Sequence, residues 1–142
     1  QFAGVLGHEM AHADRRHSTD QLTKAYGIQL LLGIVLGNNQ NQLAQIAADL
    51  AAGVATLAFS RDAEYESDEY SVKYLYNTAY DARGVGGFFL KMDGSPQPPE
   101  FLSTHPHPDN RYDKILETWE SLGGKEGEVF EASYSQFKNS LP

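Results

Sequence analysis

The segment His8-Glu9-Met10-Ala11-His12 lies near the start of the chain, within residues whose apolar members recur at helical spacing. Residues four positions apart share one face of an α-helix, so both imidazoles can reach a single ion. Glu9 lies beside them, where a glutamate can take a proton from a water molecule that zinc has made acidic. This segment therefore predicts a helix that carries two metal ligands, His8 and His12, and one general base.

The helix around this segment is expected to run from the first residue to about His17 and to end at Ser18-Thr19-Asp20. His17 lies five residues after His12, which turns it off the ligand face, so we expect it at the surface. An alternative without metal would make the two histidines of the motif exposed surface residues. Apolar residues around the motif argue against that alternative: Phe2, Val5, Leu6 and Met10.

Two further helices are expected between residues 22 and 59. The first runs from about Leu22 to Leu36, residues 37–41 have the composition of a turn, and the Ala-rich stretch 43–59 forms the second. Together they predict a helical hairpin. The apolar part at 28–36 is most simply half of that hairpin, and the alternative is a surface that contacts a membrane or an envelope-assembly partner.

An acid-rich helix supplies candidates for the third ligand that a catalytic zinc site needs. Ser60 is its expected N-cap, and it should continue to about Thr78. Carboxylates at a helix N-terminus commonly face water, and Glu66 is expected to do so. Glu64 and Asp68 differ, because they lie four apart on a face that continues through Val72 and Leu75. We therefore predict Glu64 as the third ligand and Asp68 as acceptor of the other ring N–H of a ligand histidine.

Composition limits what else the chain can be. Its 142 residues are enough for one domain with a core of its own, which we place at residues 1–142. A net charge of −8 and the lack of a basic stretch argue against a nucleic-acid partner. Without cysteine, a metal must be held by His, Asp or Glu. No apolar run reaches the roughly 18–20 residues that cross a bilayer.

The remainder of the chain completes a mainly α-helical prediction without convincing strands. Five prolines between Pro96 and Pro108 predict an irregular loop. Asp109 is the expected cap of a helix that ends at Gly123-Gly124, and residues 129–137 suit a last amphipathic helix. Gln1 reads as the interior of a helix with no cap residue and no Met ahead of it. We therefore expect a piece truncated at its N-terminus.

Three segments together resemble a known family. The motif at residues 8–12, the segment Ser60-Arg61-Asp62-Ala63-Glu64-Tyr65-Glu66-Ser67-Asp68 and the segment Ser103-Thr104-His105-Pro106 look like the zinc metallopeptidase (gluzincin) family of CAAX prenyl endopeptidase and HtpX. Its soluble periplasmic BepA-like branch fits best. The family's Glu-x-x-Ala-Asp pattern implies Glu64 as ligand and Asp68 behind a ligand histidine. Here Ser67 stands where the family usually has Ala.

The resemblance implies roles for two more residues. His105 would approach the zinc, either as a latch that occupies the position water needs or as a donor to the oxyanion. Arg111 would help to hold substrate or the oxyanion, or would form a surface salt bridge. The family's substrate-binding strand would lie upstream of Gln1, and its location would be the periplasm or cell envelope.

The expected function is hydrolysis of polypeptides by one Zn²⁺ per chain, in protein quality control. Glu9, His105 and Arg111 are the candidate catalytic residues, and His8, His12 and Glu64 are the candidate ligands. The alternative is a zinc-binding chaperone-like or interaction module that does not hydrolyse peptides. A structural zinc site needs no general base, so Glu9 separates the two hypotheses.

Overall fold

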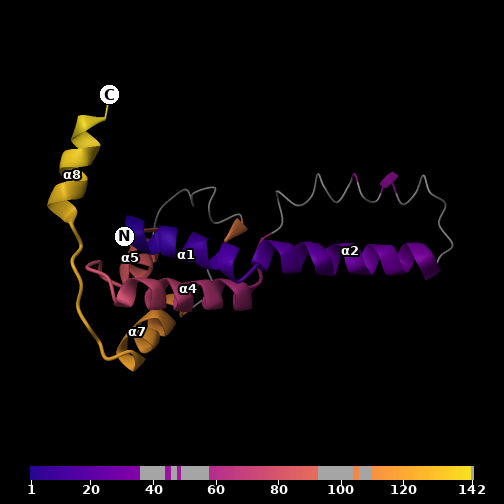
Figure 1. Ribbon diagram of the computed structural model, residues 1–142, viewed down its shortest axis with the longest axis horizontal. Coiled ribbons are helices and arrows are strands. Elements are labelled where there is room, and N and C mark those ends of the chain that lie inside the picture. The colour runs from indigo at the N-terminus through magenta and orange to yellow at the C-terminus, as the bar shows by residue number, and fades with distance from the viewer. Residues whose placement is uncertain (36–43, 46–47, 49–57, 93–103, 106–109, 142) are drawn as a thin grey trace.

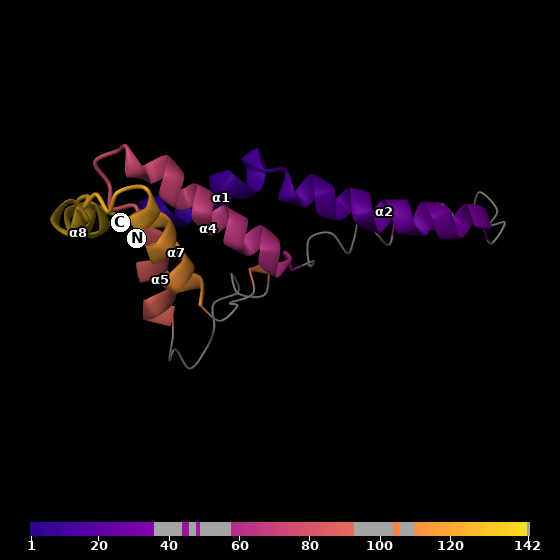
Figure 2. The same ribbon diagram turned by 90° about the horizontal axis from the view of Figure 1, so that it is seen from below.

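The computed structural model describes residues 1–35, 44–45, 48, 58–92, 104–105 and 110–141. Four helices pack into a body: α1 (Phe2–Asp14), α4 (Arg61–Tyr76), α5 (Gly84–Met92) and α7 (Arg111–Ser121). Helix α2 (His17–Val35) extends from one end of this body, and α8 (Glu131–Ser140) lies at the other end (Figure 1, Figure 2). The expectation of a mainly helical fold is confirmed for the described residues, in which β-structure is limited to a bridge between Tyr80 and Glu128.

The first helix is shorter than the sequence predicts. It ends at Asp14, and Arg16 has a φ of 61°, which turns the chain before α2 begins at His17. Backbone N–H groups of Arg15 and Arg16 donate to carbonyl oxygens of the last turn, which completes the helix end. The break predicted at residues 18–20 is therefore wrong, and His17 belongs to the first turn of the second helix.

The acid-rich helix is confirmed. The Ser60 hydroxyl accepts a hydrogen bond from the Ala63 N–H at 3.2 Å, and this N-cap starts α4 one residue later. One face of the helix is buried, and it is the face that sequence spacing predicts. Its buried members are Glu64, Ser67, Asp68, Ser71, Val72 and Leu75.

Small residues let α1 lie close to its neighbours. The Ser71 hydroxyl of α4 donates to the Gly4 carbonyl oxygen at 2.8 Å. A Cβ at Gly7 would lie 2.8 Å from the Ser71 hydroxyl oxygen, and a Cβ at Gly4 would lie 2.1 Å from the Val85 backbone nitrogen of α5. Backbone therefore meets backbone or a small side chain at both places, and the His-Glu-x-x-His helix lies directly against the acid-rich helix.

The apolar core joins α4, α5 and α7. Its buried members are Val72, Leu75, Ala82, Val85, Phe89 and Ile115. The N-cap position of α7 is Asn110, in a left-handed conformation without a side-chain cap, so the prediction of Asp109 as cap is wrong by one position. Gly123 and Gly124 end the helix with positive φ, as expected. Helix α8 buries none of its residues.

Two predictions lie mainly outside the described residues. These are the second helix of the hairpin at 43–59, and the irregular loop between Pro96 and Pro108 except for Thr104 and His105. Among described helices, none is both long and apolar enough to cross a membrane.

Candidate metal centre

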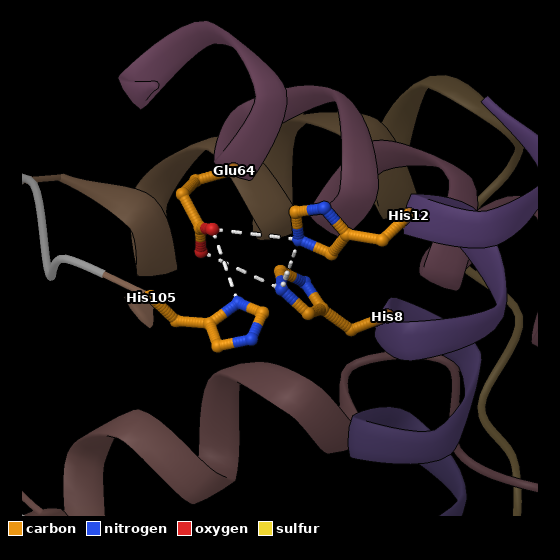
Figure 3. A group of neighbouring side chains, drawn as sticks. All are labelled: His8, His12, Glu64 and His105. Atoms are coloured by element: carbon orange, nitrogen blue, oxygen red, sulfur yellow. Dashed lines mark hydrogen bonds and ion pairs between the residues drawn. The ribbon is translucent and has the colours of Figure 1, made fainter. Parts of the chain in front are cut away.

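Four side chains from three segments converge beside the contact of α1 with α4. His8 and His12 come from α1, Glu64 comes from α4, and His105 comes from the short described segment 104–105 (Figure 3). One nitrogen or oxygen of each side chain lies within 4.8 Å of the corresponding atom of every other. All four residues are buried. Sequence spacing predicts the first three as a group, and the resemblance adds the fourth.

The atoms that face one another are those that a metal would bind. His8 Nε2 and His12 Nε2 are 3.1 Å apart. Glu64 places Oε2 3.5 Å from the first nitrogen and Oε1 3.4 Å from the second. Imidazole nitrogens and carboxylate oxygens are ligands that zinc accepts. His8, His12, Glu64 and His105 therefore form a candidate metal site.

The second oxygen of Glu64 supports this interpretation. Glu64 Oε2 is buried and accepts no hydrogen bond of good geometry within the described residues. Arg111 Nη1 lies 2.9 Å away, which is an electrostatic contact without the alignment of a hydrogen bond. A buried carboxylate oxygen with spare acceptor capacity, next to two imidazole nitrogens, is suited to a cation.

His8 is held from behind by a buried carboxylate. His8 Nδ1 donates to Asp68 Oδ1 at 2.8 Å. Arg111 binds the same carboxylate with two groups, Nε to Oδ2 at 2.6 Å and Nη2 to Oδ1 at 2.7 Å, and its guanidinium lies 3.9 Å from the centre of the Phe89 ring. Because Asp68 accepts from Nδ1, a neutral His8 carries no proton on Nε2, and an unprotonated imidazole nitrogen can bind a metal.

Arg111 is fully buried, with 0% of its surface exposed. The surface salt bridge that sequence reasoning allowed is therefore wrong, because both carboxylates that Arg111 contacts, Asp68 and Glu64, are buried too. Sequence spacing cannot show this, since α7 must pack on α4 before the side chain meets its partners.

His12 is held by a second histidine that sequence reasoning placed at the surface. His17 is 8% exposed, and its Nδ1 lies 3.1 Å from His12 Nδ1. Its Nε2 lies 2.9 Å from Glu66 Oε2, and Arg15 Nε donates to Glu66 Oε1 at 2.8 Å. The expectation of an exposed His17 is wrong because the chain turns at Arg16. Helical periodicity runs through that turn without interruption, so the sequence carries no signal for it.

Burial and hydrogen bonding act in opposite directions on these pKa values. Burial lowers the pKa of His8, but its hydrogen bond with Asp68 and its contact with the Glu64 carboxylate outweigh burial and raise the pKa above the ordinary value. Burial prevails at His12 and lowers its pKa. Burial would raise the pKa of Glu64, but its contacts with the imidazoles of His105, His12 and His8 hold the pKa well below the ordinary value. The centre therefore combines an ionised carboxylate with a neutral His12.

Glu9 lies at the open edge of the centre. Its side chain is 43% exposed, and its Oε1 is 3.6 Å from His105 Nε2. His105 also places Nδ1 3.1 Å from Glu64 Oε1. The segment that carries His105 is held by a hydrogen bond from the Phe59 N–H to the Thr104 carbonyl oxygen, and the Phe59 ring lies 4.0 Å from that of His12. His105 thus lies between the candidate base and the candidate ligand Glu64.

Comparisons with known proteins find similar chains among metalloproteases. The chain is 29% identical over 124 residues to the beta-barrel assembly-enhancing protease of Yersinia pestis, which covers 78% of this chain and 26% of that protein. It is 28% identical over 125 residues to metalloprotease YcaL of Escherichia coli, covering 81% and 47% of the two chains. It is 30% identical over 108 residues to the mitochondrial metalloendopeptidase OMA1 of Arabidopsis thaliana, covering 75% and 22%.

The chain spans about a quarter of the length of the beta-barrel assembly-enhancing proteases that it matches. No solved structure matches it significantly. A family model, peptidase family M48, matches residues 1–119, which include all four residues of the candidate centre. The chain therefore belongs to peptidase family M48.

Proposed function

We propose that this chain carries the catalytic centre of a zinc-dependent endopeptidase, with one Zn²⁺ held by His8, His12 and Glu64. The observation that carries the proposal is the convergence of His8 Nε2, His12 Nε2 and both Glu64 oxygens on one buried point. Two neutral imidazoles and one carboxylate leave such an ion with a net charge near +1. Membership of family M48 supports the same activity.

Glu9 is the proposed general base. Bound zinc acts as a Lewis acid that lowers the pKa of water to about 7 and polarises a peptide carbonyl. The exposed Glu9 carboxylate follows His8 directly in sequence and lies at the edge of the cluster, within reach of solvent. It would accept a proton from the attacking water and then deliver it to the leaving amine.

His105 is proposed to regulate or assist this chemistry. Its contacts with Glu64 and Glu9 suit a latch that occupies the open position, and they equally suit a donor to the oxyanion once a substrate displaces the ring. Arg111 is proposed to position Asp68 and Glu64, because its buried guanidinium binds both carboxylates.

A second candidate function is a zinc-binding chaperone-like or interaction module that does not hydrolyse peptides. The observation that favours it is His105, because four protein ligands would close the site as in structural zinc centres. Glu9 would then have no chemical role.

The proposed substrates are unfolded or misassembled polypeptides, and the proposed location is the periplasm or cell envelope. Relatives from Yersinia pestis and Escherichia coli that are named beta-barrel assembly-enhancing protease support both proposals. Other relatives are named mitochondrial, so the family is not confined to one compartment. Exposed Ile28, Leu31 and Ile34 on α2 support the further proposal of a peripheral membrane or assembly contact through residues 28–36.

The test combines a measurement of zinc content per chain with a measurement of the hydrolysis of an unfolded protein that carries a fluorescent label. Wild type should purify with close to one zinc per chain, and Glu64→Ala should lose most of it. Glu9→Gln should keep its zinc and lose hydrolysis, whereas Glu69→Gln, an exposed glutamate paired with Lys73, should keep both. Zinc without hydrolysis in wild type and in Glu9→Gln alike would favour the second function. Absence of stoichiometric zinc would reject both functions.

A further inference from the structure

We propose that His17 is a positioning residue that, with Glu66 behind it, holds the proton of His12 on Nδ1 and leaves Nε2 free to bind a metal. This inference rests on the proposed function, since it concerns how one proposed ligand is prepared. It assigns a role to a histidine that lies outside the His-Glu-x-x-His motif and begins a different helix.

The contacts form a chain from the surface to the centre. Arg15 Nε donates to Glu66 Oε1 at 2.8 Å, and Glu66 Oε2 is 2.9 Å from His17 Nε2. His17 Nδ1 is 3.1 Å from His12 Nδ1, and the opposite nitrogen of His12 faces His8 and Glu64. Both imidazole rings in this series of contacts, those of His12 and His17, therefore have a partner at each nitrogen.

The direction of the hydrogen bonds follows from the outer end. An ionised carboxylate can only accept, so the nitrogen of His17 that faces Glu66 must carry a proton. If His17 is the neutral imidazole, its other nitrogen carries no proton, so Nδ1 can only accept. The ring nitrogen beside it, His12 Nδ1, must donate. The remaining nitrogen of His12, Nε2, is then without a proton.

Ser67 adds a second contact at the same acceptor. Its hydroxyl oxygen is buried and lies 3.2 Å from His17 Nδ1. A hydroxyl can donate, so this contact is compatible with an unprotonated Nδ1. Glu66 and Ser67 are adjacent on α4, so one turn of this helix approaches both nitrogens of the His17 ring.

The first test needs no substitution. In the metal-free protein, long-range ¹H–¹⁵N NMR of the histidine rings reports which nitrogen carries the proton. We expect the proton on Nδ1 of His12 and on Nε2 of His17. A proton on Nε2 of His12 would overturn the proposal. This result is independent of zinc binding and hydrolysis, so it stands or falls separately from the proposed function.

The second test uses two substitutions that keep different halves of the His17 ring. His17→Asn can keep an acceptor near the position of Nδ1, whereas His17→Gln can keep a donor near the position of Nε2. We expect the zinc dissociation constant, measured by competition with a chelator, to rise about tenfold in His17→Gln and to stay within about threefold of wild type in His17→Asn. Glu69→Gln on α4, the helix that carries Glu66, is the matched control and should leave the dissociation constant unchanged.

Two outcomes would overturn the proposal in this second test. The first is wild-type affinity in His17→Gln, and the second is an equal loss in the Asn and Gln variants. The comparison of the two variants excludes a merely structural role, because either substitution would disturb packing while only Asn restores the acceptor. Hydrolysis lost in Glu9→Gln but unaffected by His17→Gln, with unchanged zinc affinity, would leave the proposed function intact and reject this inference.

Discussion

The two histidines of the motif are supported from behind in different ways. His8 contacts a buried carboxylate directly, and that carboxylate is clamped by the fully buried Arg111. His12 contacts a histidine, whose carboxylate partner Glu66 has a side chain 37% exposed. Helix α4 contributes to both supports, together with α7 behind His8 and with α2 behind His12. The support of His8 is therefore part of the core, whereas the support of His12 extends to solvent. Substitutions in the two supports should therefore differ in their effects on stability and metal affinity.

The largest effect is expected where the buried support is broken. Arg111→Met should lower the free energy of unfolding by about 3–5 kcal/mol, because it leaves two buried carboxylates without their cation. Urea denaturation of the metal-free protein measures this. Arg111→Lys should recover only part of the loss, because an ammonium cannot bind Asp68 with two parallel hydrogen bonds.

The matched change on the exposed side is Arg15→Met. Arg15 pairs with Glu66 where both side chains are substantially exposed, at 40% and 37%, so unfolding should change little. Equal destabilisation by Arg111→Met and Arg15→Met would remove the contrast between the two supports.

A smaller effect is expected on metal affinity. Asp68→Asn keeps the shape of the side chain but lets an amide face His8 Nδ1, so the zinc dissociation constant should rise about 10–100-fold. Glu66→Gln acts one residue further from the metal and should cost less. Titration of both variants with zinc against a competing chelator gives the ranking. A larger loss of zinc affinity in Glu66→Gln than in Asp68→Asn would show that the exposed support of His12 contributes more to metal binding than the buried support of His8.

The smallest effect on stability is expected at the C-terminal end of α1, where Asp14 lies. The Tyr74 hydroxyl donates to Asp14 Oδ2 at 2.6 Å, and burial together with this carboxylate raises the pKa of Tyr74 to about 12. The folded protein therefore holds the Tyr74 proton more tightly than the unfolded chain does. The stabilisation that the Tyr74–Asp14 hydrogen bond provides is lost as pH rises from about 10 to 12.

Spectroscopic titration of the tyrosines checks this expectation, with Tyr74→Phe identifying the signal of one among the eight tyrosines. Asp14→Asn should move the Tyr74 pKa toward 10.0, its ordinary value. A Tyr74 that ionises near that ordinary value in the wild type would contradict the geometry.

Helical geometry explains what the sequence predicts. The spacing of His8 with His12 and of Glu64 with Asp68 selects faces of two helices, and the structure buries those faces together. Neither His17 nor Arg111 is predictable in this way. The position of His17 depends on a turn that the periodicity hides, and the position of Arg111 depends on how α7 packs. Propensity and periodicity describe single segments, whereas these two contacts exist only between segments.

The glycines of α1 have a consequence for alignment. A helix that slides along its axis by one residue moves about 1.5 Å and rotates its side chains to new directions. Such a slip of α1 would bring a Cβ to the place where Gly4 now meets the backbone of Val85. A slip by one residue in either direction is therefore sterically unfavourable, and the observed position is the one that brings both motif histidines beside Glu64. Gly4 and Gly7, which have no side chains, thus help to fix the position of the histidines that are proposed to bind the metal.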